Sequence, residues 1–176
     1  AVYSYQKYDD ELVKQLQSLL DPTLAKVKIM PVQLNEQTAP LAKGCEAVCI
    51  FVNDKADSAT LKILASMGVK LLLLRSAGFN HVDLSEAESL GITTMRVPQY
   101  SPHAVAEMAV CLLLSLIRRI PKAYNRVREH NFNLSGLEGF TIAGKTIGVL
   151  GTGKIGQITA QILKGFGPAR LLGYDM

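Results

Sequence analysis

The stretch from Lys145 to Asp175 constrains this chain more than any other, because strand, turn and helix signals follow one another there without interruption. An apolar run at 146–150 is typical of a buried parallel strand. A glycine-rich turn and a helical pattern of apolar residues come next, and two glycines end that helix. A second apolar run at 170–174 completes the order strand, helix, strand, with an acid directly behind it. The stretch therefore predicts a single β-α-β unit.

The turn has the complete form G-x-G-x-x-G, and each glycine has a separate physical purpose. Gly151 permits a tight turn out of the strand. Gly153 has no Cβ, so a pyrophosphate can approach the backbone closely, and Gly156 lets the helix pack against the strand. The helix N-terminus directs N–H groups and a partial positive charge at the same place. The motif predicts a dinucleotide phosphate site.

Asp175 lies 19 residues after Gly156, at the end of the second predicted strand. A carboxylate there can accept hydrogen bonds from both hydroxyls of the adenosine ribose. It would repel a 2′-phosphate, so NAD is favoured over NADP. The alternative, a glycine-rich turn in some other α/β protein, does not account for this acid.

The charge of the chain is mildly basic, with a net charge of +4 over 176 residues. A local basic run occupies 118–128. No aromatic residues are interleaved with it in the way nucleic-acid sites require, so a solvated helix face is favoured and no nucleic-acid partner is expected.

Three cysteines occur, and they form neither a C-x-x-C pair nor a set with histidine at metal-ligand spacing. We therefore expect no metal site and a reduced, cytoplasmic chain. The longest apolar stretch, 108–117, is too short to cross a bilayer, so no membrane partner is expected.

Strand and helix signals alternate through the first hundred residues. This alternation predicts a parallel sheet covered on both faces, a flavodoxin-like doubly wound unit spanning 1–100. Strands are expected at 1–4, 27–30, 47–51, 69–74 and 92–97, and helices from Asp9 or Asp10, over 36–42, from Asp57 or Ser58 to 66, and over 84–90.

A long helix is expected to begin at Ser101-Pro102, with serine as the N-cap and proline in the first turn. Its part 108–117 is apolar on nearly every side, so we expect it to be buried all round. Pro121 is expected to break it, and a second helix to run over 123–130. Residues 101–176 then form an interdomain helical region followed by the first part of a Rossmann NAD-binding domain.

Several stretches together resemble one family, the D-isomer-specific 2-hydroxyacid dehydrogenases, and within it the fermentative D-lactate enzymes. They are LRSAGFNHVDL at 74–84, VPQYSP at 97–102, AVAE at 104–107, FNL at 132–134 and GTGKIG at 151–156. The resemblance implies a flavodoxin-like substrate domain and an inserted NAD domain. It also implies NAD-dependent interconversion of a small 2-oxo acid and its D-2-hydroxy acid, such as pyruvate and D-lactate.

The resemblance also implies site residues. Backbone N–H groups of Ala77 and Gly78 would hold the substrate carboxylate, which is physically reasonable because donors behind a strand's carboxyl end form anion-binding nests. Tyr100 would line the substrate side. Alternatively, Gly78 only serves a turn and Tyr100 is a packed interface aromatic. The implied cofactor-binding residues are Gly151, Gly153, Lys154, Ile155, Gly156 and Asp175.

The family's catalytic arginine, glutamate and histidine have no counterpart in this sequence. His81, His103 and His130 are the only histidines, and none lies in the family's catalytic motif, so we assign no catalytic residue. We expect the chain alone to be inactive on pyruvate. We also expect it to associate as a homo-oligomer through the helical region 102–128 and the NAD domain, since a two-stranded pair has open edges.

Other functions stay open. His103 and Met108 differ from the residues common in the family at these positions, which weakens the assignment to lactate more than the assignment to the family. A glycerate- or hydroxypyruvate-type reductase of the same family is one alternative. A non-catalytic NAD-sensing interaction protein, similar to corepressors that share the fold, and a regulatory or degenerate half-protein are others.

Overall fold

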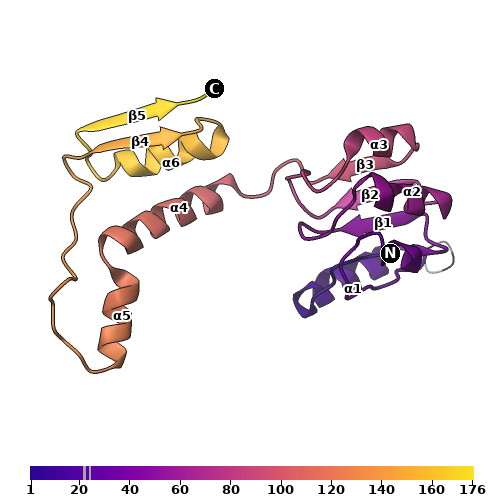
Figure 1. Ribbon diagram of the computed structural model, residues 1–176, viewed down its shortest axis with the longest axis horizontal. Coiled ribbons are helices and arrows are strands. Elements are labelled where there is room, and N and C mark those ends of the chain that lie inside the picture. Colours follow the sequence, from indigo (N-terminus) through magenta and orange to yellow (C-terminus); the bar gives the residue numbers. More distant parts are fainter. Residues whose placement is uncertain (22, 24) are drawn as a thin grey trace. The chain divides into compact units, whose positions relative to one another are not determined.

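A computed structural model describes residues 1–21, 23 and 25–176 of the chain. It divides into two compact units, Ala1–Tyr100 and Ser101–Met176, whose elements are labelled in Figure 1. The first unit contains η1 (Lys7–Asp9), α1 (Asp10–Leu19), η2 (Ala39–Ala42), β1 (Ala47–Ile50), α2 (Ser58–Ser66), β2 (Leu71–Leu74), α3 (Leu84–Ser89) and β3 (Thr93–Arg96). The second contains α4 (Pro102–Ile117), α5 (Ile120–Arg128), β4 (Thr146–Leu150), α6 (Lys154–Lys164) and β5 (Arg170–Tyr174).

The sheet of the first unit is parallel, in the order β1-β2-β3. Isolated parallel bridges join Val2 to both Cys49 and Ile29, which extends the order beyond β1. The predicted strands 1–4 and 27–30 are therefore reduced to one bridged residue each, Val2 and Ile29. The first cannot continue because Ser4 adopts a positive φ of 50°, outside the extended region.

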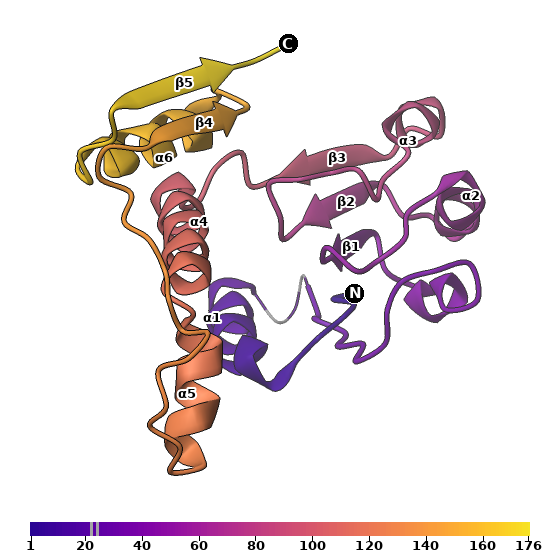
Figure 2. The same cartoon turned by 60° about the vertical axis from the view of Figure 1, so that its left-hand side comes forward.

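The core of the first unit lies against one face of this sheet. Val48 and Leu72 are fully buried, together with Leu61 and Leu64 of α2. Helices α2 and α3 lie side by side in Figure 2. Alternate strand positions are only half-buried, so among the described residues the second face is covered less completely than the sequence predicts.

The start of α2 follows the predicted capping. Asp57 accepts a hydrogen bond from Thr60 N–H at the start of α2, and Gly68, with φ of 89°, follows its end. The helix expected at 36–42 is shorter, the 3-10 helix η2. Asn35 Oδ1 accepts from the N–H groups of residues 37 and 38 in the manner of an N-cap, but Pro40 has no N–H with which to continue an α-helical ladder.

The second unit packs α4 and α6 around a small core that includes the inner face of the parallel pair β4-β5. The break between α4 and α5 falls at Arg119, whose φ is 56°, and not at Pro121. Pro121 instead occupies the first turn of α5, where its missing N–H costs nothing. No helix among the described residues is long and apolar enough to cross a membrane.

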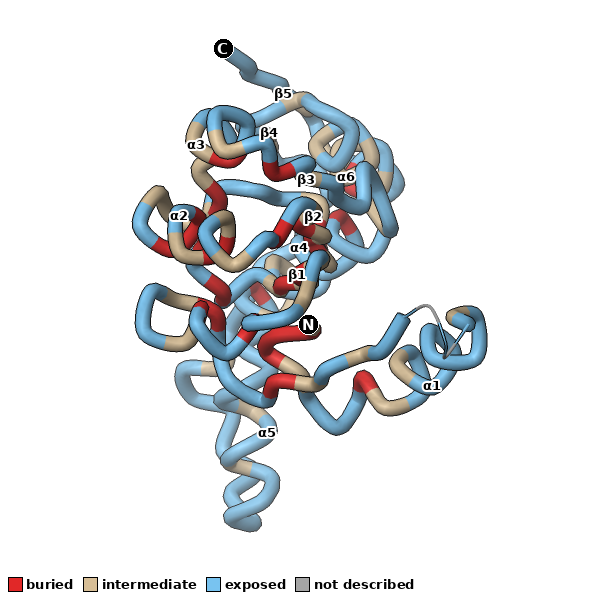
Figure 3. The backbone as a smooth tube through the Cα atoms, turned by 90° about the vertical axis from the view of Figure 1, so that its right-hand side faces the viewer, coloured by how far each residue is buried: buried red, intermediate tan, exposed pale blue. Residues whose placement is uncertain are grey.

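Helix α4 is buried on one side only, which corrects the expectation that it is buried all round. Val110 and Ile117 are buried, whereas Met108, Leu112 and Leu116 are 57%, 57% and 67% exposed. Apolar residues occupy nearly every side of the helix, but among the described residues only one of its faces packs against a core. Figure 3 shows that α5 is likewise exposed along most of its length.

Candidate functional site

The turn between β4 and α6 has the tight geometry that its glycines require. Gly151 has φ of 86°, which side-chain-bearing residues rarely adopt, and its N–H donates to Tyr174 O at 2.8 Å. A Cβ on Gly156 would lie 1.8 Å from the carbonyl oxygen of Gly151. The predicted reasons for Gly151 and Gly156 are therefore confirmed as backbone geometry.

The start of α6 is open on the side where a phosphate would approach. Gly153 is the N-cap, and a Cβ added to it would meet no heavy atom within 4 Å. The first turn begins at Lys154 and Ile155, and its N–H groups point out of the helix start, as they do in every α-helix. Such a helix start suits an anionic group, so the residues present fit a dinucleotide pyrophosphate.

Asp175 lies directly beside this turn. Its Oδ2 accepts from the N–H of Thr152 at 2.6 Å and from the Thr152 hydroxyl at 2.8 Å, and Oδ1 accepts from Met176 N–H at 3.0 Å. The Thr152 hydroxyl and then its N–H lower the pKa of the Asp175 carboxyl. The group is thus an exposed carboxylate at neutral pH, with lone pairs still available for a ligand's hydroxyls.

Two residues that complete this arrangement were not predicted. Thr152 occupies a variable position of the motif, so the pattern carries no signal for it. Gly173 lies in β5, and a Cβ there would come within 2.9 Å of Thr152 Cγ2. A glycine inside a strand is a known sign of close approach, and it could have drawn attention to this contact.

The loop after β2 contains the predicted substrate residues. No acceptor among the described residues lies within hydrogen-bonding distance of the N–H groups of Ala77 and Gly78. Their surroundings are tied down: Ser76 Oγ donates to Gly78 O at 2.8 Å, and Arg96 Nη1 donates to Ala77 O at 2.9 Å. The structure therefore leaves two consecutive N–H donors behind a parallel strand without an acceptor in the part of the chain that it describes.

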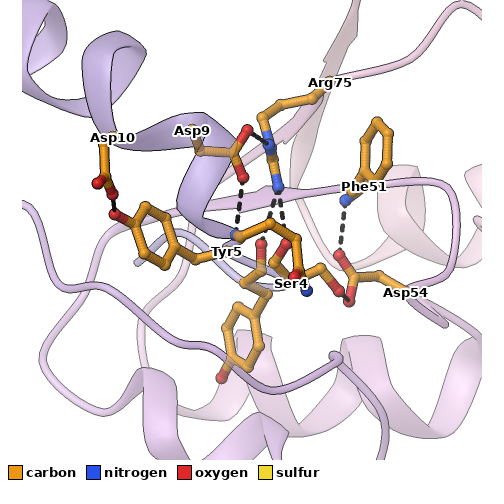
Figure 4. A network of polar contacts seen from close by, with 9 residues as sticks. Ser4, Tyr5, Asp9, Asp10, Phe51, Asp54 and Arg75 are labelled. Atoms are coloured by element: carbon orange, nitrogen blue, oxygen red, sulfur yellow. Dashed lines mark hydrogen bonds and ion pairs between the residues drawn. The ribbon is translucent and has the colours of Figure 1, made fainter.

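A buried polar network supports the same edge of the sheet (Figure 4). Asp54, 2% exposed, accepts from Ser4 Oγ at 2.7 Å, Leu34 N–H at 2.6 Å and Phe51 N–H at 2.6 Å. Three donors satisfy a charge that would otherwise be costly to bury. The network joins three segments of the chain: Ser4 follows the bridge at Val2, Leu34 follows the bridge at Ile29, and Phe51 follows β1.

Arg75 connects this network to the loop after β2. Its guanidinium pairs with Asp9 at 2.9 Å, donates to Tyr3 O at 3.1 Å and Ser4 O at 3.3 Å, and lies 5.0 Å from the centroid of the Phe51 ring. An arginine directly behind an apolar strand is a usable signal, which the sequence reasoning missed. It fixes the position at which the loop begins.

The remaining candidates have few partners. Tyr100 is 72% exposed, and none of the described residues is hydrogen-bonded to it. Burial lowers the pKa of His81, partly offset by Asp54, and His81 Nε2 is buried without a hydrogen-bond partner. No histidine in the described chain is ion-paired to an acid, and no group of three metal-ligating side chains occurs there.

Comparison with known proteins decides the family. The model of the D-isomer-specific 2-hydroxyacid dehydrogenase catalytic domain matches residues 1–168. This chain belongs to that family. The D-lactate dehydrogenase of Escherichia coli (strain K12) is 51% identical over 99% of the chain, and a 2-hydroxyacid dehydrogenase homolog of Haemophilus influenzae is 50% identical over the same share. The resemblance stated from the motifs is confirmed.

Solved structures of the same dehydrogenase family agree. The apo-structure of the Escherichia coli D-lactate dehydrogenase superposes with a TM-score of 0.84 at 50% identity, over 99% of this chain and 54% of that one. The Aquifex aeolicus D-lactate dehydrogenase, whose crystal structure is a complex with NAD and lactic acid, gives 0.81 at 30% identity, over 99% and 50%. The chain thus spans about half the length of the relatives it matches.

Proposed function

We propose that the protein containing this chain is an NAD-dependent dehydrogenase that interconverts pyruvate and D-lactate. One observation carries the cofactor assignment: the Asp175 carboxylate is hydrogen-bonded to Thr152, inside the glycine turn at the head of α6. The lactate assignment is supported by relatives that are about half identical to the chain and carry that activity in their names.

The second unit would hold the dinucleotide as the first β-α-β of a Rossmann domain. The backbone at Gly153 and the first turn of α6, including Lys154 and Ile155, would bind the pyrophosphate. Asp175 would accept hydrogen bonds from the adenosine ribose and disfavour a 2′-phosphate. When bound, NAD supplies the hydride acceptor and donor of the reaction.

The first unit would bind the substrate. The order of its bridges and strands supports the flavodoxin-like topology. Across the sheet this order is Ile29, Val2, β1, β2 and β3. In such sheets ligands bind at the carboxyl ends of the strands. The unused N–H groups of Ala77 and Gly78 are at such an end and would hold the carboxylate of the 2-oxo acid, and Tyr100 would line the substrate side.

Reduction of a carbonyl also needs a proton donor and a cation for the developing oxyanion. No histidine in the described residues is paired with an acid, as an oriented proton donor would be. We therefore propose that residues 1–176 by themselves bind NADH but do not turn over pyruvate.

Steady-state assays of the complete natural polypeptide test the proposal. We expect NADH-dependent reduction of pyruvate, oxidation of D-lactate but not L-lactate, and a preference for NADH over NADPH. A higher kcat/KM for hydroxypyruvate or glyoxylate would reassign the substrate within the family. Binding of NADH without turnover of any 2-oxo acid would contradict the enzyme assignment and favour a cofactor-sensing protein.

A further inference from the structure

The peptide units of the loop after β2 have their carbonyl groups held by the end of β3. The carbonyl oxygen of Ser76 accepts from Val97 N–H at 3.2 Å. The carbonyl oxygen of Ala77 accepts from Arg96 Nη1 at 2.9 Å. Two consecutive peptide planes are therefore fixed by donors from one neighbouring segment.

Fixing a carbonyl also fixes the N–H of the same peptide unit. In a planar trans peptide the C=O and N–H bonds point in opposite directions. The carbonyl of Ser76 shares its plane with the N–H of Ala77, and the carbonyl of Ala77 shares its plane with the N–H of Gly78. Both N–H groups therefore point away from Val97 and Arg96, whose donors bind the two carbonyls. Neither N–H group has an acceptor among the described residues.

Arg96 is itself held in the geometry this requires. Its guanidinium lies 5.3 Å from the centroid of the Phe79 ring, and Nη1 also approaches Pro98 O at 3.4 Å. A planar guanidinium can stack on a ring and donate in its own plane at once, which a lysine ammonium cannot do. The side chain therefore joins the loop backbone to the ring that follows it.

We propose that Arg96 is a positioning residue that aims the N–H groups of Ala77 and Gly78, called here the carboxylate nest, at the substrate's carboxylate. The identity of that anion as a 2-oxo acid rests on the proposed function. Gly78 has no Cβ and nothing within 4 Å of where one would be, so apart from the Ser76 hydroxyl bond to the next carbonyl, Gly78 O, no side chain of its own resists rotation of the peptide unit between Ala77 and Gly78. Without Arg96, the Ala77 carbonyl is free to turn toward the anion and repel it.

The test compares R96M and R96K with a matched control, R170M, in the complete natural polypeptide. The Arg170 side chain is exposed and makes no hydrogen bond or ion pair with the described residues, and its backbone N–H donates to Lys145 O. R170M therefore removes the same charge without touching the loop. We expect R96M to raise the KM for the 2-oxo acid by about tenfold or more, as for a lost charge-assisted hydrogen bond. The kcat and the Kd for NADH should stay near wild type, since the contact binds ground and transition states alike.

The lysine variant separates positioning from simple charge attraction. R96K keeps the charge but loses the planar fork, so its KM should lie between those of wild type and R96M. A KM in R96M equal to wild type overturns the inference, and so does a wild-type KM in R96K. If R96M does not fold, R96K alone decides by the same criterion.

A direct readout keeps this inference distinct from the proposed function. Oxamate, a small monocarboxylate, is titrated into protein labelled with ¹⁵N-glycine while the Gly78 amide resonance is followed. We expect a shift in wild type and R170M that is lost in R96M. If the wild type turns over no 2-oxo acid but gives this pattern, the function fails and the positioning role stands. If the Gly78 amide of the wild type does not respond, the positioning role is overturned.

Discussion

Asp175 and Thr152 are joined by two hydrogen bonds, one from the threonine N–H at 2.6 Å and one from its hydroxyl at 2.8 Å. This pair ties the residue behind β5 to the turn behind β4. The acid is therefore positioned by the same turn that would receive the pyrophosphate. Under the proposed function, this pair would couple the recognition of the ribose to that of the phosphates.

Removing this carboxylate should weaken NAD binding specifically. We expect D175A to lower the affinity for NADH by about tenfold to a hundredfold, because charge-assisted hydrogen bonds to the ribose are lost. Fluorescence titration of the complete polypeptide measures the Kd. T152V, which removes only the hydroxyl bond, serves as the control and should have a smaller effect. Equal affinities of D175A and wild type would remove Asp175 from the site.

Two glycines of the turn should respond differently to a methyl group. A Cβ on Gly156 would lie 1.8 Å from Gly151 O, so we expect G156A to destabilise the second unit by about 1–3 kcal/mol through overpacking. Gly153 has ordinary dihedrals and open space, so G153A should fold normally and lose only NADH affinity. Thermal unfolding and NADH titration of both variants give the comparison. A G153A protein that binds NADH as wild type does would mean that the pyrophosphate does not approach there.

The sequence predicted those parts of the fold that local chemistry determines. Asp57, Ser101 and the glycine turn behave as predicted because capping and positive φ depend on near neighbours. The break at Arg119 could not be predicted, since nothing in an arginine indicates a left-handed backbone, while Pro121 gave a plausible but misplaced signal.

The contacts around the candidate site were predicted less completely than the fold. The motif glycines and Asp175 have a fixed spacing, so the sequence alone is enough to propose them as site residues. The holding contacts of Arg75 with Asp9, and of Arg96 with Ala77, join residues far apart in sequence. No periodicity or motif predicts the partner of either arginine, because these contacts form only when the parallel strands bring their carboxyl ends together.

The stability of α2 should depend on pH through its cap. The Thr60 N–H first, and then the Lys55 ammonium, lower the pKa of Asp57 from 3.8 to about 2. A lowered folded-state pKa contributes stability above pH 3.8, and this contribution is lost as pH falls toward 2. We expect D57A to cost about 1 kcal/mol at pH 7 and progressively less below pH 4.

Urea unfolding at several pH values checks this, with D57N as the control. Asparagine keeps the cap but does not titrate, so D57N should be close to wild type at pH 7 and should differ from D57A equally at each pH. A difference between wild type and D57A that is constant from pH 7 to pH 2.5 would contradict the assigned pKa.

The exposed face of α4 should be an association surface of the complete protein. Leu112 and Leu116 are more than half exposed, although they lie in a helix apolar on nearly every side. We expect wild type to sediment as a homo-oligomer and L112D to dissociate, because an unpaired carboxylate is costly to bury in an apolar interface. Q161D, which adds the same charge at an exposed polar position of α6, should remain assembled. A monomeric wild type would refute the prediction directly. An L112D protein that stays assembled but unfolds at a lower temperature would show that α4 is covered within a single chain.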